Sequence, residues 1–142
     1  MATSSTAYTH WEGSLFEGKG SVDLRTSGAA TFDLTWAKRA EAGKGTTNPE
    51  ELIAAALAAC YSMALSNGLA GDGHPPASID TTVSVDFQPG TGITGAHVAV
   101  VGAVPGLDAD AFRVYAEDAK ENCPVSKALA GVDKTLEVTF TA

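Results

Sequence analysis

The sequence predicts an α+β fold in a single domain covering residues 1–142. Short segments in which apolar and polar residues alternate, typical of strands with one buried face, occur near both ends and in the middle of the chain. Two longer segments carry helix signals, one starting after Asn48 and one after Asp108. With 44% hydrophobic residues and no internal repeat or linker, 142 residues can bury a substantial core.

The first forty residues predict a hairpin or meander. Residues 21–25 and 30–36 alternate between apolar and polar positions, and Ser27 and Gly28 supply a turn between them. Residues 41–47 are rich in glycine and lysine, so we expect them to form a connector to the next element.

The strongest helix signal begins at residue 48. Asn48 can cap the helix, Pro49 suits its first position, and Glu51 occupies the capping-box position. Residues 52–65 are apolar on nearly every face, so this helix must be surrounded by protein. We expect the helix to end within residues 67–71. The apolar run of 14 residues is too short to cross a bilayer.

The second half of the chain alternates strands with helices. The predicted strands are residues 79–87, 96–104 and 135–140. Asp108 can cap a second helix, whose apolar stripe ends at Cys123. Pro124 then starts a short helix that reaches about residue 130.

Composition excludes several classes of partner. A net charge of −8 argues against nucleic acid and against an anionic membrane surface, because both attract basic patches. The N-terminus lacks a basic start and an apolar run, which predicts a cytoplasmic protein without a signal peptide. The three histidines lie in unrelated contexts, and neither a Cys-x-x-Cys nor a His-x-x-x-His spacing occurs, so we expect no metal site. We also expect no cofactor.

The two cysteines, Cys60 and Cys123, leave two interpretations open. If folding brings them together they form a redox-active pair, and if not, both are small buried hydrophobes. Cys60 lies in an apolar helix, where burial raises a thiol pKa, so a reactive Cys60 needs a cation beside it. An arginine is the better choice, and only Arg25, Arg39 and Arg113 are available.

Cys123 has the better local setting for a thiolate. It precedes Pro124 at the start of a short helix, where main-chain N–H groups lower a thiol pKa. Local physics alone therefore favours Cys123 as the attacking thiol. Glu50 lies ten residues before Cys60, or about 15 Å along a straight helix. It is either a solvated acid of the first turn or serves a site elsewhere, such as that of a partner subunit.

Three motifs are similar to those of a known family. They are Thr-Asn-Pro-Glu-Glu-Leu-Ile-Ala-Ala-Ala at 47–56, Ala-Ala-Cys-Tyr-Ser-Met-Ala-Leu at 58–65 and Asn-Cys-Pro-Val-Ser-Lys at 122–127. The chain resembles the OsmC branch of the superfamily that also holds the organic hydroperoxide resistance proteins. Shorter matches at 10–13, 18–20, 78–82 and 104–108 extend the resemblance over nearly the whole chain.

The resemblance implies an intertwined homodimer, with antiparallel sheets around two central helices, that reduces organic hydroperoxides. It implies that Cys60 attacks the peroxide and Cys123 resolves the product, the reverse of the order that the helix end favours. The family's arginine corresponds best to Arg39, with Arg25 as the fallback because the residues around Arg39 differ from the family pattern. The family's glutamate corresponds to Glu50, and both residues are supplied across the dimer interface.

The sequence thus predicts a thiol-dependent peroxidase that is recycled by an external dithiol, for which the family suggests a lipoyl protein. Apolar neighbours of the first cysteine, such as Leu57, Tyr61 and Met63, are candidates for lining a substrate pocket. Two other functions remain open. One is a redox sensor that uses the same cysteines once, and the other is a small-molecule binding domain in which the cysteines only pack.

Overall fold

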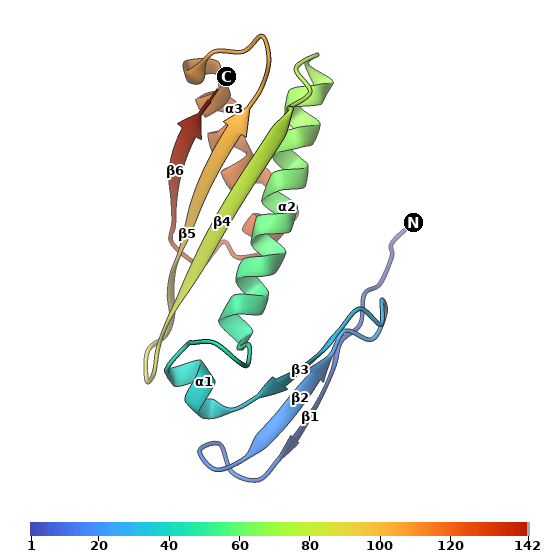
Figure 1. Ribbon diagram of the computed structural model, residues 1–142, viewed down its shortest axis with the longest axis vertical. Helices are drawn as coiled ribbons and strands as arrows, with labels where there is room; N and C mark the ends of the chain where they lie inside the picture. The colour runs from blue at the N-terminus through green and yellow to red at the C-terminus, as the bar shows by residue number, and fades with distance from the viewer. Residues whose placement is uncertain (142) are drawn as a thin grey trace. The chain divides into compact units, whose positions relative to one another are not determined.

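The computed structural model describes residues 1–141, which form two compact units, residues 1–52 (unit 1) and 53–141 (unit 2). Helices and two three-stranded sheets within these residues confirm the α+β class (Figure 1). The prediction of a single domain stays a prediction. The helix α2, Pro49–Gly71, begins in unit 1 and continues through unit 2.

Unit 1 contains an antiparallel sheet in the order β1-β2-β3, formed by Tyr8–Glu12, Lys19–Asp23 and Thr31–Leu34. The predicted hairpin is confirmed, with Leu24 and Ala30 closing the turn between β2 and β3. Every residue of β1 is exposed, and Val22 is the only buried strand residue described in this sheet. Such a sheet has almost no core of its own.

A short helix, α1 (Trp36–Ala40), follows β3 and was not predicted. The Thr35 hydroxyl caps it by accepting a hydrogen bond from the Lys38 N–H at 3.3 Å. The predicted cap of α2 is confirmed, because the Asn48 side chain accepts from the Glu51 N–H at 2.8 Å. Glu51 does not complete a capping box, since its carboxylate accepts from the Thr47 hydroxyl instead.

Unit 2 packs helices against one face of a sheet ordered β4-β5-β6, formed by Ser78–Gln88, Gly92–Ala103 and Lys134–Phe140. Helix α3 (Ala109–Asn122) and the short α4 (Pro124–Ala128) lie between β5 and β6 in the chain. Figure 1 shows α2 and α3 running beside this sheet. The buried core is made by α2, α3 and the inward residues of β5.

One detail of the expected sheets is wrong. The strands β4 and β5 are antiparallel, but β6 runs parallel to β5. Two antiparallel strands can be joined by a hairpin, whereas a parallel return needs a long crossover. The α3–α4 segment provides that crossover and so carries Cys123 past the inner face of the sheet.

Helix α2 buries only one of its faces within the single chain. Leu57, Tyr61, Leu65 and Leu69 are at most 1% exposed, whereas Met63 is 73% exposed. The helix also runs beyond Leu65, so the expectation that it is too short to cross a bilayer is wrong on length. Among residues 1–141, α2 is the one helix that is long and apolar enough to cross a membrane, judged by length and composition alone. Its buried face is also consistent with the core helix of a protein outside the membrane.

Candidate active site

The two cysteines lie together in unit 2. Cys60, in the middle of α2, is partly buried and packs against the core cluster, of which the fully buried Cys123 is a member. Cys60 also lies close enough to raise the pKa of the Cys123 thiol. Both residues are free thiols in this structure. The fold therefore brings the two cysteines into one cluster in unit 2.

Cys123 occupies the joint between two helices, as the sequence predicts. Its N–H donates to the Ala119 carbonyl at 3.0 Å and closes α3. Its sulfur accepts from the Ser126 N–H at 3.3 Å and caps α4. Pro124 takes the first position of α4, where its missing N–H costs nothing.

The pKa of the Cys123 thiol does not fall, although the start of a helix was expected to lower it. Burial is the largest influence and raises the pKa of the Cys123 thiol above its ordinary value. The main-chain N–H groups of Ser126 and Val125 lower this pKa, as expected for a cap, but nearby Cys60 raises it again. The net direction is upward, so local physics does not favour Cys123 as the thiolate.

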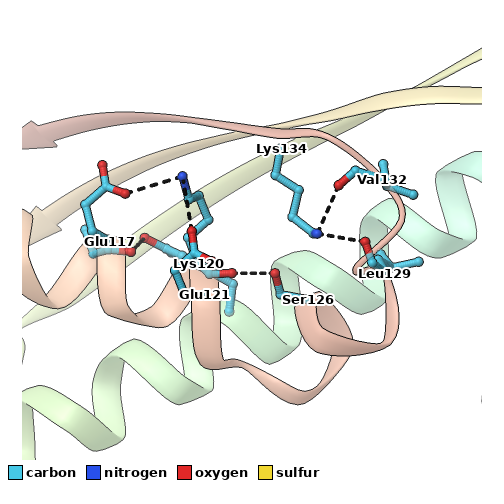
Figure 2. A network of polar contacts seen from close by, with 9 residues as sticks. Glu117, Lys120, Glu121, Ser126, Leu129, Val132 and Lys134 are labelled. Atoms are coloured by element: carbon cyan, nitrogen blue, oxygen red, sulfur yellow. Dashed lines mark hydrogen bonds and ion pairs between the residues drawn. The ribbon is translucent and has the colours of Figure 1, made fainter.

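A polar network holds α4 in place between α3 and β6 (Figure 2). The Ser126 hydroxyl donates to the Lys120 carbonyl at the end of α3. The Lys134 ammonium donates to the carbonyls of Leu129 and Val132 at 2.8 and 3.1 Å. The Leu129 carbonyl also accepts from the Val132 N–H at 2.9 Å, so the lysine joins the turn that follows α4 to the start of β6.

Unit 1 holds the other predicted pair. The Arg39 guanidinium, on α1, donates from Nε and Nη2 to Oε1 of Glu50 at 3.2 and 3.0 Å. Glu50 is only 4% exposed, and its Oε2 is a buried oxygen without a hydrogen-bond partner within residues 1–141. Asn48 donates from its side-chain amide to the Lys38 carbonyl at 3.2 Å and ties the start of α2 to α1.

Arg25, the fallback arginine, has a different environment. Its Nε contacts the Asp23 carboxylate at 3.3 Å, and its guanidinium lies 4.1 Å from the centre of the Tyr8 ring. The side chain is 54% exposed. The arginine that pairs with Glu50 is therefore Arg39.

Beside Arg39, unit 1 has a hollow of about 320 Å³ that the sequence did not reveal. It is lined by Trp11, Leu15, Leu34, Thr35, Trp36, Arg39 and Pro49. The pocket candidates chosen from helix position lie elsewhere, because Leu57 and Tyr61 are buried in the core of unit 2 and Met63 is exposed. Periodicity could not reveal a pocket formed by strand ends and by an unpredicted short helix.

No group of three or more His, Cys, Asp or Glu side chains that could hold a metal ion occurs within residues 1–141. Two pairs of side chains in the structure suit chemistry on a peroxide, the cysteines in unit 2 and the arginine–carboxylate pair in unit 1. A thiol pair supports disulfide exchange, and a guanidinium stabilises developing negative charge.

An α+β chain with these pairs can be compared with known proteins. The model of the OsmC-like protein family matches residues 42–137. The chain is 42% identical over 132 residues to the peroxiredoxin OsmC of Escherichia coli strain K12, covering 91% of this chain and 92% of that protein. It is 38% identical over 103 residues to the organic hydroperoxide resistance protein of Xanthomonas axonopodis pv. citri, covering 70% and 69%.

Solved structures agree with the sequence comparison. The organic hydroperoxide resistance protein OhrB of Bacillus subtilis superimposes with a TM-score of 0.69 at 30% identity, covering 94% of this chain and 98% of that one. The chain therefore belongs to the OsmC-like family.

Proposed function

We propose that this chain is a thiol-dependent peroxidase that reduces organic hydroperoxides to alcohols. Two relatives are named a peroxiredoxin and an organic hydroperoxide resistance protein, which supports chemistry on peroxides. The observation that carries the proposal is the packing of Cys60 and Cys123 in one core cluster, although the two residues are 63 positions apart in the sequence. Such a pair suits a cycle between a dithiol and a disulfide.

The first step oxidises Cys60. Its thiolate attacks the peroxide oxygen that carries the hydrogen, the O–O bond breaks, and the leaving alkoxide takes up a proton to become the alcohol. Cys60 is left as a sulfenic acid. The raised pKa of Cys123 supports this order, because a buried and protonated thiol is the weaker nucleophile towards the peroxide.

The second step joins the two sulfur atoms. Cys123 attacks the sulfenic acid of Cys60, water leaves, and a disulfide forms that protects Cys60 from further oxidation. An external dithiol then opens the bridge by exchange and is itself oxidised to a disulfide. We propose a lipoyl protein as this reductant and the cytoplasm as the compartment, where thiols are kept reduced.

Arg39 and Glu50 complete the proposed site from the partner subunit of a homodimer. Glu50 lies ten residues before Cys60 on the same helix, or about 15 Å along its axis, so it cannot serve the Cys60 of its own chain. Arg39, held by Glu50, would keep the attacking thiol ionised and stabilise charge on the leaving oxygen. The exposed face of α2 and the open sheet of unit 1 support the homodimer, since both leave apolar surface uncovered.

Turnover with two single variants tests the proposal. We expect repeated consumption of cumene hydroperoxide with dihydrolipoamide, none with Cys60→Ser, and a single sulfenic acid that dimedone traps with Cys123→Ser. Consumption of only one equivalent by the unaltered protein would support the redox sensor instead. Retained turnover in Cys60→Ser would leave the cysteines as packing residues and end the enzyme assignment.

A further inference from the structure

The hollow beside Arg39 contains both tryptophans of the chain. The sequence has two, Trp11 and Trp36, and both line this cavity of about 320 Å³. Leu15 and Leu34 add aliphatic surface, while Arg39 is the only charged residue in the lining. An aromatic hollow with one cationic wall suits a molecule with an apolar body and an electron-rich polar end.

Trp11 is held in a fixed position by two features of the main chain. Its indole Nε1 donates to the Gly13 carbonyl at 3.1 Å. Across the sheet its direct partner is Gly20, where a Cβ atom would lie only 2.7 Å from Cε3 of the indole and 2.4 Å from the His10 carbonyl oxygen. A Cβ at Gly18 would lie 2.9 Å from the indole nitrogen. The two glycines of the 18–20 motif therefore leave room for the ring to lie against β2.

Trp36 is held in position by its helix and by a neighbouring aromatic ring. It is the first residue of α1, and its ring meets the Phe16 ring edge to face, with the ring centres 5.6 Å apart. Arg39 follows on the same helix, three residues later, and is held by Glu50. Rigid aromatic walls bind an apolar group at little cost in conformational entropy.

We propose that Trp11 and Trp36 form an aryl-binding site that gives this chain a preference for hydroperoxides bearing a compact aromatic group. The inference rests on the proposed peroxidase function and specifies its substrate class. The aryl group would lie against the indoles, and the peroxide oxygens would point towards Arg39. A hollow of this volume holds a substituted benzene ring more completely than it holds a long, flexible acyl chain.

Binding can be measured without turnover, because no other tryptophan contributes fluorescence. In the Cys60→Ser variant, 2-phenyl-2-propanol, the alcohol made from cumene hydroperoxide, should change the fluorescence in a saturable way. Hexan-1-ol should bind at least about tenfold more weakly, because it forms no ring contacts. Absence of a saturable change, or equal binding of the two alcohols, would overturn the aryl site.

Substitutions in the same background locate the site. Trp11→Leu should weaken binding of the aryl alcohol about tenfold, whereas Tyr8→Leu, which removes an exposed aromatic from the same strand outside the hollow, should not. Leu15→Phe, at a residue 49% exposed and hence tolerant of change, should fill the hollow and also weaken binding. If the tryptophan fluorescence changes with protein concentration and not with the alcohols, a second copy of the chain covers the indoles. The aryl site would then be wrong.

Kinetics separate this inference from the proposed function itself. With Trp11→Leu, kcat/KM for cumene hydroperoxide should fall about tenfold relative to that for hydrogen peroxide. If the unaltered protein turns over peroxides and this ratio does not change, the aryl site is wrong and the peroxidase stands. If no peroxide is turned over while the aryl alcohol still binds to Trp11, the peroxidase is wrong and the hollow is a binding site for aryl ligands.

Discussion

Arg39 and Glu50 illustrate how much chemistry depends on the geometry of single residues. Two nitrogen atoms of the guanidinium share one carboxylate oxygen, which fixes the plane of the arginine side chain. A lysine can keep the charge but cannot reproduce a two-pronged contact. The sequence pointed to this pair through the family resemblance, since the residues around Arg39 carry no distinct local signal.

Arg39→Lys should therefore lower kcat/KM for cumene hydroperoxide by about 10²-fold, the usual effect of losing one donor that stabilises transition-state charge. The matched control is Arg25→Lys, at an exposed arginine that contacts Asp23 and the Tyr8 ring. That variant should retain full activity in the same steady-state assay. Equal losses in the two variants would remove Arg39 from the proposed site.

Two buried residues of unit 2 should make the free energy of unfolding fall as the pH becomes alkaline. Burial raises the pKa of Tyr61 and, as its largest influence, the pKa of Cys123, so the folded state holds both protons more tightly than the unfolded chain does. Their stabilising effect is complete below the unfolded pKa values, near 9 for the thiol and 10 for the phenol, and is lost as pH rises beyond them.

Urea unfolding of the reduced protein between neutral pH and pH ~11 should thus show falling stability above the ordinary thiol pKa. Tyr61→Phe should flatten the upper part of this decline. It should also cost about 1 kcal/mol at neutral pH, because the Tyr61 hydroxyl donates to the Ala116 carbonyl at 2.9 Å. A pH profile identical in the two proteins would contradict this account.

Among the elements, those with strong caps were predicted well. Asn48 and Asp108 begin α2 and α3, and Cys123 lies at the α3–α4 joint, because side-chain caps are local signals that tertiary packing did not override. The strand β1 and the helix α1 were missed. All of β1 is exposed, so it has no alternating pattern, and a helix of five residues is too short to show a period.

The packing of one element against another could not be predicted from sequence patterns either, and Gly102 is an example. A Cβ atom added at this position on β5 would lie 2.1 Å from Cζ of Phe112, which is fully buried against the Phe140 ring. The glycine therefore permits α3 to approach the sheet. The thiol at the end of α3 depends on that approach.

Gly102→Ala should destabilise the protein by about 1–3 kcal/mol, the usual cost of overfilling a packed core. Gly131→Ala is the control, because a Cβ there meets nothing within 4 Å and the residue lacks a positive φ. Denaturant midpoints measured by circular dichroism compare the two. A stable Gly102→Ala protein would show that the α3 contact adjusts freely.

At the scale of the whole molecule, the single chain leaves apolar surface uncovered. The sequence predicted an α2 surrounded by protein, whereas within one chain α2 buries only the face that contacts the core of unit 2. A single chain does not show what covers the other face of α2, so the homodimer stays a proposal. The same surface gives that proposal a direct test.

Met63→Glu, at a residue 73% exposed on α2, should weaken self-association by at least about tenfold, because a carboxylate would lose its water in an apolar interface. Val114→Glu, at a residue 69% exposed on α3, should leave association unchanged. Sedimentation velocity over a range of concentrations separates monomer from dimer. A dimer of undiminished affinity in Met63→Glu would place the interface elsewhere.

The most direct test of the proposed cycle is the state of the two sulfur atoms after one equivalent of cumene hydroperoxide. Mass spectrometry of the intact protein and of its peptides, without reductant, should show loss of two hydrogens and a bond between Cys60 and Cys123 of the same chain. Two free thiols after the peroxide has been consumed, or cysteines joined only between different chains, would contradict it.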